Sequence, residues 1–337
     1  MADGANGRVA ELPILVLNAH SRCNCRCVMC DIWKREDGTE ITVADLERHR
    51  SSLRRLSVEW VVISGGEPLM HGDLAGLCNF LRELDVHLTL LTTGLLLERR
   101  AAEVASLFDD VIVSLDGPAE VHDAIRRVKG SFQSIQSGVA ALHALRPAMR
   151  IRGRTTVQKA NHHLLQNTVG SAMALGLDGI SFLAVDVTSE AFNRPLLWPE
   201  EKQHVVTLSA EETSVLEQEI EEVIVHYEEE IRSGYVAECP AKLRKIAAQF
   251  RAYLGQVQHE SPRCNAPWVS AVIEADGAVR PCFFQPAIGN IRKSSLEEII
   301  NGEAARSFRH NLDVAKDPIC QRCVCSLNHP VRNGLPS

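Results

Sequence analysis

The feature that most restricts how this chain can fold is a regular alternation of strand-like and helix-like segments between residues 14 and 185. Short apolar runs without helical spacing predict strands at 14–17, 58–64, 86–92, 111–115, 149–157 and 180–185. Amphipathic stretches predict helices between them at 43–53, 74–84, 98–108, 132–145 and 164–175. Strands connected through helices form a parallel α/β sheet by right-handed crossovers. Six such strands suit a partial (β/α)6 TIM-type barrel, and periodicity alone leaves an open doubly wound sheet as the alternative.

The eleven cysteines of the chain lie mainly near its two ends. No apolar run reaches the ~18 to 20 residues that span a bilayer, and residues 1–11 lack the layout of a signal peptide. We therefore expect a cytoplasmic protein with no membrane partner, in which reducing thiol pools disfavour disulfides and cysteines act as metal ligands. The net charge of −7 offers no basic stripe for a phosphate backbone, which argues against a nucleic-acid partner.

Three cysteines follow directly after the first predicted strand with the spacing C-x3-C-x2-C, at Cys23, Cys27 and Cys30. This spacing lets one loop wrap an iron-sulfur cluster. A four-iron cluster with three cysteine ligands keeps one iron open, which predicts a cofactor or substrate that chelates iron. A zinc knuckle or a patch of surface thiols is the alternative that the spacing alone leaves open.

Short motifs also stand at the ends of the next predicted strands. Ser64-Gly65-Gly66-Glu67-Pro68 ends the second, Thr92-Thr93-Gly94 the third and Ser114-Leu115-Asp116-Gly117 the fourth, and His122-Asp123-Ala124-Ile125-Arg126 follows. Paired glycines let main-chain oxygens approach a ligand ammonium, and Glu67 can supply the counter-charge. Together with the cysteine motif, these segments resemble the radical S-adenosylmethionine (SAM) superfamily.

That resemblance implies a set of cofactor contacts. The SAM amino group would be held by Gly65, Gly66, Glu67 and Pro68, and its ribose and carboxylate would be contacted by Ser114, Asp116 and Arg126. The planar fork of an arginine suits a carboxylate, which is the physical basis of the role given to Arg126. A surface ion pair is the alternative for this residue, and Arg152 or Arg154 on the fifth strand could serve in its place.

The C-terminal cysteines form a second set. Cys264 is followed by Gly277 and Cys282 in the pattern C-x12-G-x4-C, and a C-x2-C pair comes later. The set resembles the SPASM and twitch subfamily. This resemblance implies one auxiliary four-iron cluster, whose ligands would be Cys264, Cys282, Cys320 and Cys323. Cys325 could replace either member of the later pair, and four thiolates also suit a structural zinc site.

These expectations divide the chain into consecutive parts. They are an N-terminal tail at 1–12, the radical SAM partial barrel at 13–190, a helical connector and substrate cover at 191–262, the auxiliary-cluster domain at 263–326 and a C-terminal tail at 327–337. The connector is expected to contain an acidic helix at 211–231 and a basic helix at 241–251. The auxiliary domain is expected to be small and twitch-like, with a β-hairpin around a glycine turn and a helix at 296–308.

The resemblance implies an enzyme, a radical SAM oxidoreductase with SAM and two 4Fe-4S clusters as cofactors. It would cleave SAM reductively to a 5'-deoxyadenosyl radical, using a ferredoxin- or flavodoxin-type electron donor, and abstract a hydrogen from its substrate. An auxiliary cluster favours net oxidation, such as alcohol to ketone. Because the first strand begins near Pro13, without the leader-recognition extension common in peptide-modifying members, a small-molecule substrate is favoured.

Two alternatives remain for the function. One is modification of a peptide by epimerisation or crosslinking, in which Cys239 is the candidate thiol that returns a hydrogen atom, with a buried inert cysteine as the plainer interpretation. The other is a non-catalytic zinc or iron-sulfur protein, which has no need for the motifs at 64–68 and 114–117. Asp186, at the end of the sixth strand, is placed to face the substrate and is a candidate catalytic residue.

Overall fold

The computed structural model describes residues 2–3, 7–194 and 197–330 of the chain. Positions 1, 4–6 and 331–337 of the predicted tails, and 195–196 of the predicted connector, lie outside the described residues. The division of the chain into consecutive parts is not tested by the structure and stays a prediction.

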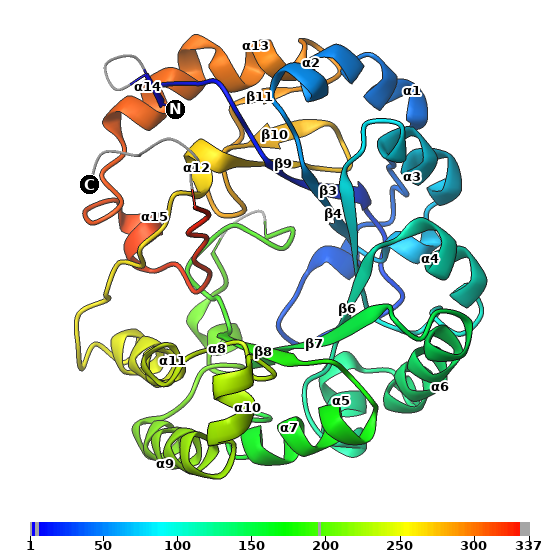
Figure 1. Cartoon of the computed structure of the whole chain (residues 1–337). Coiled ribbons are helices and arrows are strands. Elements are labelled where there is room, and N and C mark those ends of the chain that lie inside the picture. The colour runs from blue at the N-terminus through cyan, green and yellow to red at the C-terminus, as the bar shows by residue number, and fades with distance from the viewer. Residues whose placement is uncertain (1, 4–6, 195–196, 331–337) are drawn as a thin grey trace.

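One sheet forms the centre of the molecule (Figure 1). Its strands are β3 (Ile14–His20), β4 (Trp60–Gly65), β5 (His87–Thr92), β6 (Asp110–Ser114), β7 (Arg150–Val157), β8 (Ile180–Ala184), β9 (Ser270–Ile273), β10 (Ala278–Arg280) and β11 (Gly289–Asn290). Within the described residues these nine strands pair in the order β11-β10-β9-β3-β4-β5-β6-β7-β8, while β1 (Ala2–Asp3) pairs with β2 (Arg8–Val9). All neighbours from β9 to β8 run parallel. The predicted parallel partial barrel is confirmed.

Helices cover the outer face of this sheet (Figure 1). Those between the strands are α1 (Val43–Glu47), α2 (Arg50–Arg55), α3 (Leu74–Arg82), α4 (Ala101–Leu107), α5 (Ala119–Arg126), α6 (Ser131–Leu145) and α7 (Leu165–Ala174), with the short 3-10 helices η1 (Ile32–Lys34) and η2 (Pro68–Met70). The later ones are α8 (Glu200–Gln203), α9 (Ala210–His226), α10 (Glu228–Ser233), α11 (Pro240–Tyr253), α12 (Ala266–Val269), α13 (Leu296–Asn301), α14 (Glu303–Asn311) and α15 (Pro318–Gln321). Among the helices that the structure describes, none is both long and apolar enough to cross a membrane.

The helices depart from the sequence prediction in two ways. The predicted helices at 43–53, 211–231 and 296–308 are each interrupted, giving α1 and α2, α9 and α10, and α13 and α14. Gly302 explains the last interruption, because its extended backbone ends α13 and precedes α14. In addition, α5 is a helix that the periodicity did not predict, and its last turn becomes part of the site.

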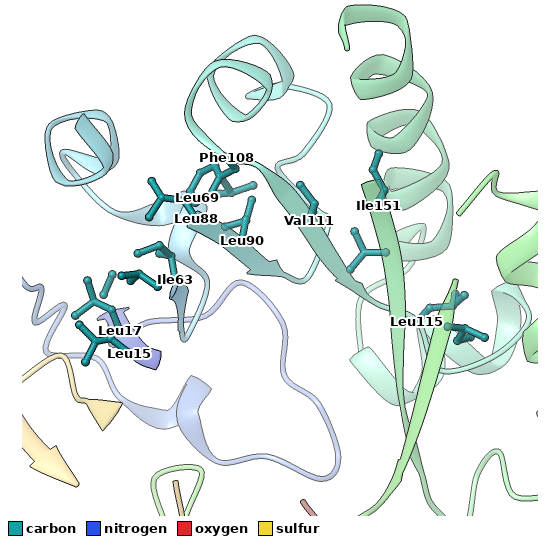
Figure 2. Packing of buried hydrophobic residues seen from close by; sticks show 14 of the residues in the cluster. Leu15, Leu17, Ile63, Leu69, Leu88, Leu90, Phe108, Val111, Leu115 and Ile151 are labelled. Carbon is teal, nitrogen blue, oxygen red and sulfur yellow. The ribbon is translucent and has the colours of Figure 1, made fainter. Parts of the chain in front are cut away.

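The apolar core lies between the sheet and these helices. Figure 2 shows Leu88, Leu90 and Phe108 together in this layer, and all three are fully buried. In β7 burial alternates from residue to residue, as the pleat of a strand requires. Ile151 is buried in the core, whereas its neighbours on the opposite face stay exposed, namely Arg150, Arg152 and Arg154. The inner face of β7 therefore carries polar side chains.

The C-terminal hairpin extends the barrel sheet. β9 pairs in parallel with β3, from Ile14 beside Ser270 to Leu17 beside Ile273, and β10 returns antiparallel to β9. The predicted glycine turn is present, since Gly277 has a φ of +85°. Without β9, β3 would be an edge strand with unpaired backbone groups. The auxiliary segment and the barrel therefore share one continuous sheet.

Candidate functional site

The predicted cluster loop follows β3 and is tied to the end of α5. The amide of Arg26 donates to the carbonyl of Arg126, and the amide of Val28 donates to the carbonyl of Ile125, each at 3.1 Å. The last carbonyls of a helix have no partners within the helix itself. The loop therefore supplies these partners, and α5 in turn fixes the backbone on both sides of Cys27.

The thiols of this loop have polar and positively charged neighbours. Nη1 of Arg126 lies 3.5 Å from Sγ of Cys27, and the amide of Ile32 donates to Sγ of Cys30 at 3.4 Å. A hydrogen bond from Cys25, together with the charge of Arg126, lowers the pKa of the Cys27 thiol. Because the thiolate is the form that binds metal, Cys27 is prepared to act as a ligand.

Within the described residues, no three His, Cys, Asp or Glu side chains surround a point where a single metal ion would sit. An iron-sulfur cluster requires a different arrangement, because each thiolate binds a different iron of an extended group. Cys23, Cys27 and Cys30 lie near enough for the first two to raise the pKa of Cys30, a shift that is caused mainly by burial.

The turn after β4 packs against the start of the cluster loop. The amide of Gly66 donates to the carbonyl of His20 at 2.8 Å, and the amide of Glu67 donates to the carbonyl of Arg22 at 2.9 Å. A Cβ on Gly66 would lie 2.0 Å from the carbonyl oxygen of Arg22. Gly65 has a φ of +124°, which other residues rarely adopt. Both glycines are therefore needed for this close backbone contact.

Replacing Gly66 with Ala should lower the free energy of unfolding by roughly 1–3 kcal/mol, because the added methyl group forces the turn and the loop apart. Urea denaturation measures this change. Gly170→Ala is the matched control, since Gly170 lies in α7 with only the Tyr227 hydroxyl near its Cβ position, at 3.8 Å. Equal stability of the two variants would show that the close contact at Gly66 does not matter.

The carboxylate of Glu67 is buried and engaged by the protein. One oxygen accepts from the Leu69 amide at 3.0 Å and the Thr92 hydroxyl at 2.8 Å. The other accepts from the amide and the hydroxyl of Thr93 at 2.7 and 2.6 Å. Burial raises the pKa of Glu67, and these donors oppose the shift. This side chain joins the turn after β4 to the end of β5, and its role as the counter-charge of an ammonium stays a prediction.

Arg126 forms a buried ion pair. Its Nε lies 2.6 Å from Oδ2 of Asp116, whose Oδ1 accepts from the amide of Thr156 on β7 at 3.2 Å. Burial alone would lower the pKa of Arg126, but the charge of Asp116 holds it above its ordinary value. The alternative of a surface ion pair is wrong, because Arg126 is 7% exposed. Ser114 is the last residue of β6, so the predicted contacts meet at the carboxyl edge of the sheet.

Several buried polar atoms at this edge have no hydrogen-bond partner among the described residues. They include Oδ1 of Asn18 in β3, Nδ2 of Asn24 in the cluster loop and both side-chain polar atoms of Gln158 just after β7. Each unpartnered buried polar group costs about 1–3 kcal/mol. A polar ligand at the carboxyl edge would remove this cost, so the residues present fit the cofactor that the motifs imply.

The segment after β8, residues 186–194, crosses the cluster loop, and we call it the strap. Asp186 and Arg194 form a buried ion pair at 2.7 Å within it. Nη2 of Arg194 donates to the carbonyl of Met29 at 3.2 Å, and its guanidinium lies 4.3 Å from the ring of Trp198. The carboxylate of Asp186 is thus already paired, and its catalytic role stays a prediction.

The strap also contacts the C-terminal half of the chain. The ring of Phe192 lies 5.1 Å from that of Phe283, which is adjacent to Cys282. Phe192 and Asn193 both have a φ of +61°, a conformation that side chains other than glycine adopt only under constraint. The strap therefore bridges the loops that carry the two cysteine sets. Sequence reasoning missed Phe192 and Arg194, because a single aromatic or basic residue in a polar segment has no spacing signal.

The C-terminal cysteines gather near α12 and α15. Burial raises the pKa of Cys282, Cys320 and Cys323, and the charges of Cys264 and Cys325 add to the shift for Cys282 and Cys323. The assignment of Cys264, Cys282, Cys320 and Cys323 as ligands, with Cys325 as the alternative to either of the last two, stays a prediction.

The remaining candidate, Cys239, lies elsewhere in the fold. It is exposed at the start of α11, where its carbonyl accepts from the amide of Leu243 at 3.0 Å. The interpretation of Cys239 as a buried inert cysteine is wrong, because the residue is exposed. Its role as a hydrogen donor stays a prediction.

Two family models match this chain. The model of the radical SAM superfamily matches residues 17–156, and that of an iron-sulfur cluster-binding domain, SPASM, matches residues 264–324. The first match includes the cluster loop and the motifs after β4 and β6. The second includes every C-terminal cysteine up to Cys323.

Three curated proteins illustrate the range of relatives. The pre-heme d1 synthase of Dinoroseobacter shibae is 31% identical over 45% of this chain and 38% of its own length. The AdoMet-dependent heme synthase of Methanosarcina barkeri is 25% identical over 90% of this chain and 87% of its own length. The antilisterial bacteriocin subtilosin biosynthesis protein AlbA of Bacillus subtilis is 25% identical over 83% of this chain and 57% of its length. For the pre-heme d1 synthase, the match thus spans less than half of the relative.

Solved structures share the fold. The native protein anSMEcpe with bound AdoMet superimposes with a TM-score of 0.65 at 18% identity, over 90% of this chain and 83% of that chain. At this identity the similarity concerns the fold alone. It agrees with the partial barrel and its C-terminal extension.

Proposed function

The chain is a member of the radical SAM superfamily with a C-terminal SPASM-type domain, and on this premise we propose that it oxidises a small molecule. Its cofactors are SAM and two iron-sulfur clusters. When bound, they would supply the radical that abstracts a substrate hydrogen and accept the second electron that the substrate loses. An alcohol that loses a hydrogen atom, a proton and this electron becomes a carbonyl compound. A ferredoxin- or flavodoxin-type protein is the proposed electron donor.

One observation carries the proposal of net oxidation: the strap touches the loops of both cysteine sets. Arg194 donates to the carbonyl of Met29, next to Cys30, and Phe192 packs on Phe283, next to Cys282. A substrate bound beside the strap could meet one cluster on each side. This arrangement suits a reaction in which a hydrogen leaves toward one side and an electron toward the other.

The residue assignments of this proposal are those of the sequence motifs. The first cluster would be held by Cys23, Cys27 and Cys30, the second by Cys264, Cys282, Cys320 and Cys323, and SAM by Gly65, Gly66, Glu67, Pro68, Ser114, Asp116 and Arg126. Besides contacting SAM, Arg126 would also position the cluster loop in this proposal, because its guanidinium already contacts Asp116 and Cys27. The guanidinium of Arg126 is expected to fix the position of the cluster loop and to place a positive charge beside Cys27.

The similarity to the heme synthase of Methanosarcina barkeri supports a substrate that is not a peptide, since that match covers most of both chains. Modification of a peptide is the second candidate. The similarity to AlbA, named for bacteriocin biosynthesis, favours it. The two candidates can be separated with an extract that stimulates release of 5'-deoxyadenosine. Stimulation that survives protease treatment of the extract supports a small molecule, and stimulation that is lost supports a peptide.

Replacing Cys282 with Ser should remove the second cluster and leave the first in place. After anaerobic reconstitution we expect about eight irons per chain in the wild type and about four in the variant, because each cluster holds four. The variant should still release 5'-deoxyadenosine from SAM without substrate, because Cys282 belongs to the second set. Iron, sulfide and zinc analysis with an assay under a strong reductant measures these results.

Two outcomes of that experiment would contradict the proposal. Zinc in place of iron, with SAM left uncleaved by the wild type, would favour the non-catalytic scaffold. Complete loss of 5'-deoxyadenosine in the Cys282 variant, with the first cluster still present, would show that the second set is not auxiliary.

A further inference from the structure

The inner face of β7 presents two arginines, Arg152 and Arg154, that form no ion pair among the described residues. Arg152 and Arg154 lie on the face opposite the buried Ile151 and are exposed, although β7 is an internal strand of the sheet. Successive residues on one face of a strand are roughly 6.6 Å apart, so these two positive charges repel each other. An anion between them would relieve the repulsion.

Other arginines near the site are already neutralised. Arg126, Arg194 and Arg280 each have a carboxylate oxygen within 3.0 Å. Among the described residues, by contrast, neither Arg152 nor Arg154 forms an ion pair, and Nε of Arg154 donates to the hydroxyl of Ser181 in a long hydrogen bond of 3.4 Å. Burial raises the pKa of Glu238 and the charge of Arg154 opposes this shift, so Arg154 feels one carboxylate at longer range. Both arginines remain exposed, which leaves their guanidinium groups accessible to a ligand.

The neighbours of Arg154 place this pair beside the predicted SAM contacts. In the sheet register Arg154 stands beside Ser114 of β6, a predicted SAM contact, and beside Ser181 of β8. Gln158 continues the same row just beyond the strand, with both of its side-chain polar atoms buried and unpartnered.

We infer that Arg152 and Arg154 form the substrate-anchoring site and that the substrate carries an oxyanion, either a carboxylate or a phosphate. This inference rests on the proposed function and adds the class of substrate to it. The paired forks of two arginines bind such groups through parallel hydrogen bonds, and the amide of Gln158 can bind a further polar group of the same molecule. The anchored substrate would lie beside the predicted SAM-binding edge of the sheet, next to Ser114.

The test uses the reconstituted, oxidised full-length protein with saturating SAM, so that binding is measured without turnover. Isothermal titration calorimetry with citrate probes the carboxylate arm, and titration with pyrophosphate probes the phosphate arm. We expect the wild type to bind at least one of the two. The double variant Arg152→Gln, Arg154→Gln should bind it at least tenfold more weakly, while its affinity for SAM stays within a factor of two. If citrate binds, the oxyanion of the substrate is a carboxylate, and if pyrophosphate binds, it is a phosphate.

Two further variants sharpen this test. Arg150→Gln removes an exposed arginine from the same face of β7 at the amino end of the strand, and it should leave anion binding unchanged. Lysines at 152 and 154 keep the charge but lose the fork, so binding should fall between the wild type and the glutamine variant.

Three results would overturn the inference. They are no anion binding by the wild type, equal loss in the Arg150 variant, and loss of SAM affinity in the double variant without loss of anion binding. The last result would make these arginines the carboxylate contact of SAM. Failure of the proposed function is seen separately, as the absence of 5'-deoxyadenosine from the reduced wild type.

Discussion

Replacing Cys27 with Ala is expected to reduce release of 5'-deoxyadenosine from SAM to the background of the assay. The first cluster has three cysteine ligands in this proposal, and Cys27 is the one that the structure prepares most clearly. Its thiol lies 3.5 Å from Nη1 of Arg126, and a hydrogen bond from Cys25 lowers its pKa. We expect the iron content to fall from about eight to about four per chain, since the second cluster should remain.

Cys78→Ala is the control for this experiment. Cys78 is buried in α3 and belongs to neither cysteine set, so its loss should leave both the iron content and the release of 5'-deoxyadenosine close to wild type. Wild-type release of 5'-deoxyadenosine by the Cys27 variant would remove this residue from the ligand set. It would also require another explanation for the contact with Arg126.

Replacing Asp186 with Ala is expected to lower the free energy of unfolding by about 3–5 kcal/mol, because it leaves the charge of Arg194 buried without a partner. Both side chains are almost fully buried, at 2% and 1% exposure. Chemical denaturation of the full-length chain measures the change. The double variant Asp186→Ala, Arg194→Met should recover much of the stability, since it removes the unpaired charge as well.

The ion pair between Glu221 and Arg244 provides the comparison, because both side chains are about half exposed, at 52% and 54%. Glu221→Ala should cost less than about 1 kcal/mol, as exposed pairs usually do. If the Asp186 variant were no less stable than the Glu221 variant, the strap would not depend on its ion pair. Asp186 would then be free to act as the catalytic residue that the sequence predicted.

Much of the fold could be predicted from the sequence, because its signals are local. The spacing of apolar residues placed the strands from β3 to β8 and most of the helices between them. Helix boundaries were less certain, since interruptions such as the one at Gly302 depend on backbone conformation. The pairing of β9 with β3 could not be predicted, because about 250 residues separate the two strands and periodicity does not record which edges meet.

The same distinction between local signals and long-range contacts applies to the site. The sequence by itself determined the cysteine loops and the paired glycines at 65–66, because ligand spacing and backbone conformation act over a few residues. Only the tertiary structure decided that Arg126 is buried against Asp116 and Cys27, and that Arg194 reaches the carbonyl of Met29. Only the structure, too, showed which arginines form ion pairs and which form none among the described residues. Charges pair across the folded molecule, between residues whose distance along the chain leaves no pattern to read.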